Sequence, residues 1–475
     1  MNGRIDRLVS QPEGKTLEFK REISSPRNLL RTLVAFANSA GGRLVVGVDD
    51  SGNVVGVDNP LAEEERIGSM VADGIMPRLV PDVQLVTVEG KALLVVEVFP
   101  SGRRPHHVAV EGPTDGVYVR LGSSNRMADQ GIVASLARST QTFTFDELPL
   151  PELTAEDLDL DATAQLSADG HALLSEAQLL SLKLLTRDQG RVTPTHAGML
   201  LFGRDIERYF PDARVQAARF LGADKSVFLE HTEFKLPLLK LPARIEEFLK
   251  EHAERGSQAS RLGDDEMWPT LLTIMREVVI NALVHADYSQ RGAPLRVAYF
   301  DDRFEVTSPG LLMPGLTVED MQAGISRIRN PVLARVFREL GLMDQWGSGV
   351  PRIFKDAKRL GLPEPVVTET VAGVQFTVFT LPADRIRAGG RFLSFEVGGH
   401  TGRIMQLLRN GPLSLHELSE QLGPDSRHLQ LSLDKLLECG YIETDARFRS
   451  MSTATYYRLT PQGFSRAELV AKAGV

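Results

Sequence analysis

Hydrophobic positions in the first 140 residues form several short strand-like runs and one stretch with helical spacing. The runs GGRLVVGVDD, DVQLVTVEGKALLVVEVF and GVYVRLG are short, rich in valine and leucine, and separated by Gly, Asp and Asn, as is typical of strands joined by turns. Before them, SPRNLLRTLVAFANSAGG has helical spacing, with Ser25 or Pro26 placed to open a helix and Gly41 to close it. The pattern predicts an α+β domain over residues 1–140.

The rest of the pattern divides the chain further. Residues 141–164 are acidic and punctuated by proline, as in an extended connector. Residues 165–264 are mixed, and we expect them to pack with the next segment. Residues 265–385 carry a long helix, two strands, a Gly-rich segment and another helix, and residues 398–465 carry three short helical patterns and a strand pair. A chain of 475 residues suits about three or four domains, so the expected fold class is α+β and multidomain.

The helix expected over residues 270–287 carries a polar stripe in an apolar setting. Glu277, Asn281 and His285 stand four residues apart among valine, isoleucine, leucine and alanine. Residues at this spacing share one face of a helix. Burying that face without partners would be costly, so the stripe predicts a cleft or a ligand.

Four places in the segments after this helix carry polar residues or glycines. They are the strand end Ser308-Pro309-Gly310, the arginines Arg327 and Arg329, the pair Asn330-Pro331, and the helix start Gly347-Ser348-Gly349. Asn followed by Pro is a natural cap and first turn of a helix, and glycine at a helix start lets the backbone approach an anion.

This order suits a nucleotide. Glu277 could orient or deprotonate water, and the amide oxygen of Asn281 is a hard ligand for a Mg²⁺ that bridges phosphates. Arg327 and Arg329 could close over the triphosphate as a lid. For each feature alone a simpler reading exists, in which Glu277 and Asn281 satisfy neighbouring backbone groups and the glycines are turn residues. The features in combination favour the nucleotide.

Four stretches of this segment resemble the ATP-binding domain of the GHKL superfamily, an α/β sandwich, in the branch found in bacterial Schlafen-domain proteins. They are REVVINALVHADYSQRG, YFDDRFEVTSPG, RNPVLARVF and GLMDQWGSGVPRI. Members of that branch are often labelled helicase-related or transcriptional regulators. The resemblance implies ATP and Mg²⁺ as ligands, with Glu277 as the general base and Asn281 as the Mg²⁺ ligand. The cofactor-binding set is then Asn281, His285, Ser308, Gly310, Arg327, Arg329, Asn330, Gly347, Ser348 and Gly349.

One residue departs from the superfamily pattern. Where most members have an aspartate that reads the adenine amino group, this chain has Ser308. We therefore expect weaker recognition of the base, and binding of ATP is better supported than its hydrolysis. A scaffold that has lost its nucleotide is a third reading of the same residues.

A second candidate site lies at the N-terminus, in PEGKTLEFKRE and at the end of RLVVGVDD. Glu13, Glu18 and Asp49 could hold a divalent metal, with Lys20 steadying a water or phosphate, as in nucleases. Glu and Lys alternating on an edge strand more commonly form a solvated face. The stretch also resembles the start of a Schlafen AlbA-type domain, with LLRTLVAFANSAGGRLVVGVDDSGNVVGV and VYVRLGSSNRMAD, over about residues 11–140. That resemblance implies the same two glutamates and aspartate.

The basic residues expected to contact nucleic acid form two groups. Arg103 and Arg104 lie in the densest basic cluster of the N-terminal domain, SGRRPHHVAV. In the C-terminal module, leucines at helical spacing and the pair YIET and TYYRLT predict a winged helix-turn-helix. Its candidates are Arg427 and His428 on the third helix and Arg447 and Arg449 on the wing. The nearly balanced charge of this module leaves a protein–protein role as the alternative.

Bulk composition narrows the function. The net charge of -8 excludes a generic polyanion binder, so nucleic acid would need a local patch. Cys439 is the single cysteine, the N-terminus has no apolar signal segment, and no uninterrupted apolar run approaches a membrane span, so we expect a cytoplasmic protein with no membrane partner. No P-loop motif occurs in the chain.

These observations predict an ATP-binding transcriptional regulator that associates with nucleic acid, DNA being favoured, in which nucleotide controls DNA or partner binding. The resemblance to GHKL proteins adds a homodimer or higher homo-oligomer. The alternative is a metal-dependent Schlafen-like nuclease that acts on RNA or DNA and carries an ATP-binding regulatory domain.

Overall fold

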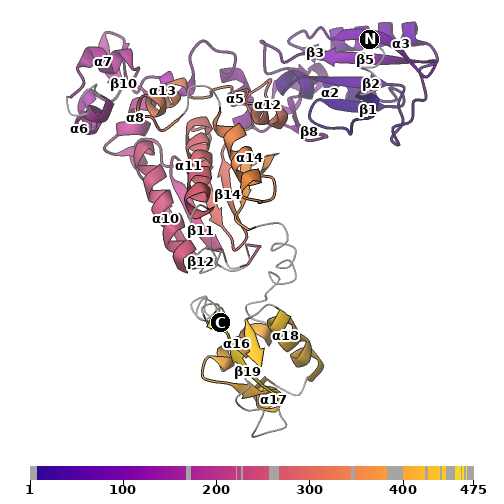
Figure 1. Cartoon of the computed structure of the whole chain (residues 1–475). Coiled ribbons are helices and arrows are strands. Elements are labelled where there is room, and N and C mark those ends of the chain that lie inside the picture. The colour runs from indigo at the N-terminus through magenta and orange to yellow at the C-terminus, as the bar shows by residue number, and fades with distance from the viewer. Residues whose placement is uncertain are drawn as a thin grey trace.

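The computed structural model describes residues 8–166, 173–220, 222–225, 228–255, 267–343, 348–381, 400–422, 426–438, 441–444, 455–461, 463–464 and 467. Three larger sheets, of four, six and three strands, follow one another along the chain (Figure 1). The expected α+β, multidomain class is confirmed.

The first sheet has the order β1-β2-β5-β4, with β1 and β2 parallel and the other pairs antiparallel. Its strands are β1 (Leu17–Lys20), β2 (Gly42–Val46), β4 (Asp82–Val88) and β5 (Lys91–Val98). The helices are α2 (Pro26–Asn38), α3 (Pro60–Gly74), α4 (Gly112–Asp115) and α5 (Gln130–Arg138), and the small strand pairs are β3 (Ile75–Met76) with β6 (His107–Val108) and β7 (Tyr118–Leu121) with β8 (Ser124–Met127). Helix α2 begins where the sequence predicts, because the Ser25 hydroxyl accepts from the Asn28 amide.

The connector is packed rather than extended through solvent. Leu150, Leu153 and Leu158 are buried in the same hydrophobic core as the six-stranded sheet. The sequence expectation missed this packing because acidic residues surround these leucines. The elements here are short: α6 (Leu160–Thr163), α7 (Glu176–Ser181), β9 (Leu185–Asp188), β10 (Arg191–Pro194), α8 (His196–Phe202) and α9 (Ile206–Tyr209), with 3-10 turns at Phe145–Glu147, Ala155–Asp157 and Ala164–Leu166.

The six-stranded sheet has the order β12-β11-β13-β14-β16-β15. Its strands are β11 (Val215–Phe220), β12 (Phe228–Phe234), β13 (Leu295–Tyr299), β14 (Arg303–Ser308), β15 (Val366–Thr370) and β16 (Gly373–Phe379). Strand β11 pairs in parallel with β13, so the region expected to connect two domains supplies two strands of this sheet.

Helices cover one face of this sheet (Figure 1). They are α10 (Leu241–Arg255), α11 (Met267–His285) and α14 (Gly349–Arg359), while α12 (Val318–Gln322) and α13 (Pro331–Glu339) lie beyond one end of the sheet. Alternate residues of β14, such as Phe304 and Val306, point into the core that α11 shares. Within the described residues, α11 is the one helix long and apolar enough to cross a membrane, but 56% of its most apolar window is buried in the protein, as expected of a core helix.

The C-terminal module contains α16 (His400–Leu408), β17 (Leu413–Ser414), α17 (Leu415–Leu422), α18 (Ser426–Glu438), β18 (Ile442–Thr444) and β19 (Tyr456–Leu459). The strands form a sheet of order β17-β19-β18. The leucines predicted to line the three helices supply the core, among them Leu408, Leu418 and Leu433. This element order is the one a winged helix requires, and that assignment stays a prediction.

Candidate nucleotide site

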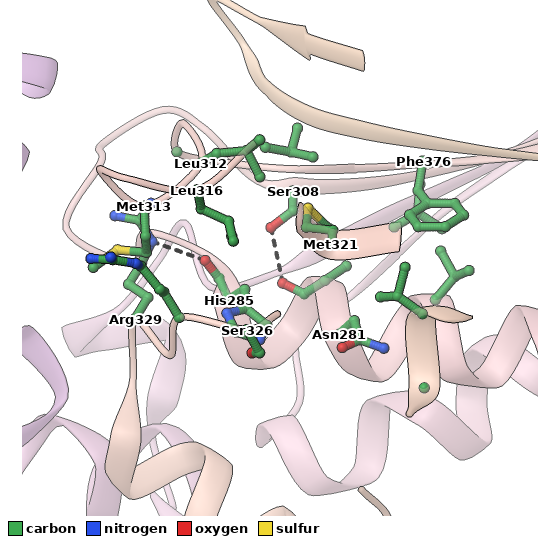
Figure 2. Close-up of a pocket in the computed structure, with 18 of the residues that line it drawn as sticks. Asn281, His285, Ser308, Leu312, Met313, Leu316, Met321, Ser326, Arg329 and Phe376 are labelled. Carbon is green, nitrogen blue, oxygen red and sulfur yellow. Dashed lines mark hydrogen bonds between the residues drawn. The ribbon is translucent and has the colours of Figure 1, made fainter. Parts of the chain in front are cut away.

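A cleft lies between α11, β14, β16 and the start of α14. It encloses about 960 Å³ with its solvent-open part included. Apolar residues from the strands, the loop after β14 and α12 line the cleft, namely Val306, Leu312, Met313, Leu316, Met321, Val374 and Phe376. Eight of the predicted site residues also line it: Glu277, Asn281, His285, Ser308, Gly310, Arg327, Arg329 and Gly349. Figure 2 shows several of these side chains around the cleft.

The predicted polar stripe on α11 forms a hydrogen-bonded chain. The Asn281 amide nitrogen donates to the Glu277 backbone carbonyl at 2.8 Å and to its carboxylate Oε1 at 3.1 Å. The other carboxylate oxygen, Oε2, accepts from the Arg352 guanidinium at 2.7 Å. Both Asn281 bonds use the amide nitrogen, and among the described residues the amide oxygen has no hydrogen-bond donor. Such an oxygen is suited to ligate Mg²⁺.

The start of α14 is packed against Glu277. A Cβ atom placed on Gly349 would lie 2.0 Å from the Glu277 Oε1 atom, so any larger residue here would displace the Glu277 carboxylate. Ser348 is the residue before the helix, makes no side-chain cap bond and does not line the cleft. Gly347 lies outside the described residues.

Ser308 and Gly310 form the end of β14 beside the cleft. The Ser308 hydroxyl donates to the Ala282 carbonyl of α11 at 2.9 Å, which ties the strand to the helix (Figure 2). Gly310 has a φ of +95°, and a Cβ there would lie 2.7 Å from the Asp287 Cβ atom. Both features demand glycine, so the Ser-Pro-Gly turn is required by backbone geometry as well as by any ligand.

His285 ends the stripe as a neutral side chain. Burial and the nearby Arg329 charge lower the pKa of His285 to about 4. Its imidazole is therefore uncharged at neutral pH and adds no cation to the cleft.

Arg329 lines the cleft as predicted and is bonded to several neighbouring groups. Its guanidinium donates to the carbonyls of His285, at 3.0 Å, and Leu311, and to the Ser135 hydroxyl of α5 at 3.3 Å. It also pairs with the buried Asp287 at 3.6 Å. Although burial raises the pKa of Asp287, the Arg329 charge and hydrogen bonds bring it below its usual value. In this structure these bonds connect α5, α11 and the loop after β14, and a lid function stays a prediction.

Arg327 is the exposed member of the expected lid. It lines the cleft and lies against Gly315, where a Cβ would be 3.0 Å from its guanidinium carbon. No hydrogen bond or ion pair of its side chain is recorded among the described residues.

Asn330 does not reach the cleft, contrary to expectation. It is buried, and its amide nitrogen donates to the carbonyls of Val284 and Ala286 at 2.8 Å each. It precedes α13 as predicted but makes no side-chain cap bond. Asp146 of the connector caps the start of α13 instead. Its carboxylate accepts from the Val332 amide at 2.8 Å and from the Leu333 amide at 3.1 Å. Burial raises the pKa of Asp146.

The N-terminal carboxylates do not come together as expected of a metal site. Glu13 accepts from the Phe19 amide at 2.8 Å, while Asp49 accepts from the Asn53 amide at 2.8 Å. The hydrogen bonds to Asn53 lower the pKa of Asp49. In the part of the chain that the structure describes, no three His, Cys, Asp or Glu residues are placed to hold a metal ion.

Glu18 is held by a cation that the sequence analysis missed. The fully buried Arg120 donates to Glu18 at 2.6 Å and to the carbonyl of Gly14 at 3.1 Å. Lys20 pairs with the other Glu18 oxygen at 2.5 Å. An arginine in the strand-like run VYVRLG is the sequence signal that could have revealed this pair.

The predicted nucleic-acid contacts are only partly described. Arg103 is exposed, whereas Arg104 is half-buried and donates to the Ser139 hydroxyl at 3.3 Å. Burial and the nearby Arg327 charge lower the pKa of Arg104. The side chains of Arg427 and His428, and the whole of Arg447 and Arg449, lie outside the described residues.

The N-terminal domain contacts the segments that surround the cleft. The Gly315 amide donates to the Ser39 carbonyl at 3.0 Å, Lys15 pairs with Glu369, and Arg138 lies 3.7 Å from Asp287. A second cavity, of about 460 Å³ with its open part, lies between the two domains. Four residues line both cavities, namely Leu311, Leu312, Met313 and Arg329. We call these four residues the shared wall.

Comparison with known proteins agrees with two of these units. Residues 13–129 match the family described as Schlafen, AlbA_2. Residues 292–379 match the family described as putative ATP-dependent DNA helicase recG C-terminal.

Two solved structures are similar to parts or all of the chain. A protein from Corynebacterium diphtheriae is 18% identical, with 96% of this chain and 100% of that chain covered and a TM-score of 0.39. The N-terminal domain of a putative ATP-dependent DNA helicase RecG-related protein from Nitrosomonas europaea is 31% identical, with 27% of this chain and 92% of that chain covered and a TM-score of 0.22.

The chain is therefore a multidomain protein of the Schlafen AlbA type with an ATPase-like domain. More particularly, the first unit is a Schlafen AlbA_2 domain and the second is an ATPase-like domain of the RecG C-terminal kind, as the sequence resemblances imply. Together the two families associate the chain with ATP and with nucleic acid.

Proposed function

We propose that this protein is an ATP-binding, DNA-associated transcriptional regulator, and that Mg²⁺-ATP occupies the cleft beside α11. One observation carries the proposal. Glu277 accepts hydrogen bonds from the Asn281 amide nitrogen, which leaves the Asn281 amide oxygen as a hard ligand in the cleft. Gly349, at the start of α14, lines the same cleft. The apolar side of the same cleft suits a purine base.

Calorimetric titration of ATP, with and without Mg²⁺, tests this site. We expect saturable binding that depends on Mg²⁺ and is lost in Asn281→Ala. Thr273→Ala is the matched control, because Thr273 lies on the same helix, is exposed and bonds only to its own helix backbone. Equal binding by the wild type and Asn281→Ala would remove Asn281 from the site, and no binding by the wild type would end the proposal.

The regulatory part of the proposal is that nucleotide occupancy changes DNA binding or oligomeric state. It is supported by the shared wall, because a ligand that moves Leu312 or Met313 also moves the boundary with the AlbA_2 domain. DNA affinity and molecular mass should both be measured with and without saturating Mg²⁺-ATP. Indifference of both quantities would contradict the regulation while leaving ATP binding intact. We further propose a cytoplasmic homo-oligomer as the working form.

The nuclease alternative receives less support. A metal-dependent nuclease needs carboxylate oxygens that are available to the ion, whereas Glu18 is already paired with Arg120 and Lys20. We expect labelled single-stranded DNA and RNA to remain intact with Mg²⁺ or Mn²⁺. Cleavage that Glu18→Ala abolishes would restore the nuclease as the leading function.

A further inference from the structure

Arg352 is the partner of Glu277 and has no function in the proposal so far. It lies in the first turns of α14, three residues after Gly349. Its guanidinium contacts the Glu277 Oε2 atom at 2.7 Å, and the Glu277 side chain lines the cleft. The Arg352 guanidinium therefore contacts the same Glu277 carboxylate that lines the cleft.

The two members of this pair differ in freedom. The side chain of Glu277 is 9% exposed and is held between Asn281 and Gly349. The side chain of Arg352 is 48% exposed, and no other side-chain contact of it is recorded among the described residues. A half-exposed ion pair is weak, so Arg352 is the member that can move.

The two arginines that line the cleft, Arg327 and Arg329, are placed differently. Arg329 is committed to backbone carbonyls and to Asp287. Arg327 lies against Gly315, in the loop after β14. In Figure 2, Met313 and Arg329 lie at one end of the drawn cleft and Asn281 at the other. Arg352 does not itself line the cleft, but Glu277 joins it by hydrogen bonds to Asn281, the proposed Mg²⁺ ligand.

We infer that Arg352 recognises the terminal phosphates of the nucleotide by exchanging the Glu277 carboxylate for phosphate oxygens. This inference rests on the proposed function of the cleft. Triphosphate arriving at Asn281 and the start of α14 brings more negative charge than one carboxylate, and guanidinium groups form strong charge-assisted bonds with phosphate. The exchange also frees the Glu277 Oε2 atom, which becomes able to accept a proton from water only after Arg352 has left.

The inference predicts selectivity for phosphate number. Arg352 adds to the binding of ATP but not to that of AMP, whose single phosphate lies next to the ribose. With Mg²⁺ present, Arg352→Gln should weaken ATP binding by about tenfold or more and change AMP binding by less than about twofold. Arg352→Lys keeps the charge and should restore part of the ATP preference.

The experiment is calorimetric titration of ATP, ADP and AMP, each with Mg²⁺, into the full-length wild type, Arg352→Gln, Arg352→Lys and Lys355→Gln. Lys355 is the matched control, because it is an exposed cation on the same helix with no contact to Glu277 recorded. Circular dichroism and thermal melting show whether each variant is folded.

The outcomes are distinguishable. Loss of the ATP-over-AMP preference in Arg352→Gln, with the preference kept in Lys355→Gln, supports the exchange. If Arg352→Gln is less stable but keeps the same ratio of ATP to AMP affinity, Arg352 is only a structural partner of Glu277 and the inference is overturned. If the wild type binds none of the three nucleotides, the proposed function itself fails.

Discussion

The cleft beside α11 and the surroundings of Glu18 in the AlbA_2 domain contain similar residues that serve different purposes. Both contain a glutamate paired with an arginine: Glu277 with Arg352 in the cleft, and Glu18 with Arg120 in the N-terminal domain. Arg352 is half exposed, whereas the side chain of Arg120 has no exposed surface. The first pair can open to a ligand and the second holds the fold together.

The difference shows that residue type and spacing do not make a site by themselves. What matters is whether an oxygen or nitrogen is left over once the protein's own groups are satisfied. Around Asn281 one amide oxygen remains, and the neighbouring volume is open. At Glu18 each carboxylate oxygen already has a cation as its partner.

Breaking the buried pair should give the largest effect on stability. Arg120→Ala leaves Glu18 as a buried charge with its main partner removed, so we expect a loss of about 3–5 kcal/mol in the unfolding free energy of the N-terminal domain. Denaturant unfolding followed by circular dichroism measures this loss. Arg103→Ala, at an exposed site, should change the same quantity by less than about 0.5 kcal/mol.

Crowding the cleft should give the next largest effect. Gly349→Ala places a methyl group on the Glu277 carboxylate, which costs about 1–3 kcal/mol in stability and displaces the start of α14. We expect ATP binding to become undetectable by calorimetry. Gly68→Ala is the control, because a Cβ there meets no atom within 4 Å, and it should stabilise helix α3. Normal ATP affinity in Gly349→Ala would mean that the α14 start does not contact the ligand.

Acid should lower the unfolding free energy of the protein, because His285 is neutral when folded. Its folded pKa, about 4, lies below its unfolded value of 6.5, so the unfolded chain binds more protons between these pH values. Stability contributed by neutral His285 is therefore complete above pH 6.5 and falls as pH drops toward 4, by at most about 1.4 kcal/mol per pH unit. His285→Gln should flatten the unfolding free energy over this window. An unchanged slope would show that other groups dominate.

The smallest effect is expected at the surface of the domain boundary. Arg138 is partly exposed and lies 3.7 Å from Asp287, so Arg138→Ala should cost about 0.2–1 kcal/mol, and less at high salt. Thermal melting at two salt concentrations measures it. A loss of several kcal/mol would mean that this ion pair bears more of the domain contact than its exposure suggests.

Sequence patterns predicted the local features of the molecule well. The four-residue spacing on α11 marked Glu277 and Asn281, the Ser25 cap marked the start of α2, and leucine spacing marked the C-terminal helices. Each of these depends on residues within a few turns of one another.

The features that the sequence did not predict depend on distant partners. Arg120 and Glu18 are 102 residues apart, Asp146 and Val332 are 186 apart, and Arg352 and Glu277 are 75 apart. Nothing in the local sequence around Arg329 separates a guanidinium aimed at phosphate from one bonded to backbone carbonyls. Only the packing of α5 and α11 decides that.

The shared wall affects how this protein can be cut into pieces. Leu311, Leu312, Met313 and Arg329 belong to the ATPase-like domain by sequence, yet Ser39 and Ser135 of the AlbA_2 domain hold the loop and the arginine from behind. A fragment that begins after residue 141 would contain every residue that lines the cleft. It would lack the N-terminal residues that contact the shared wall. Its nucleotide affinity would then describe the fragment rather than the protein.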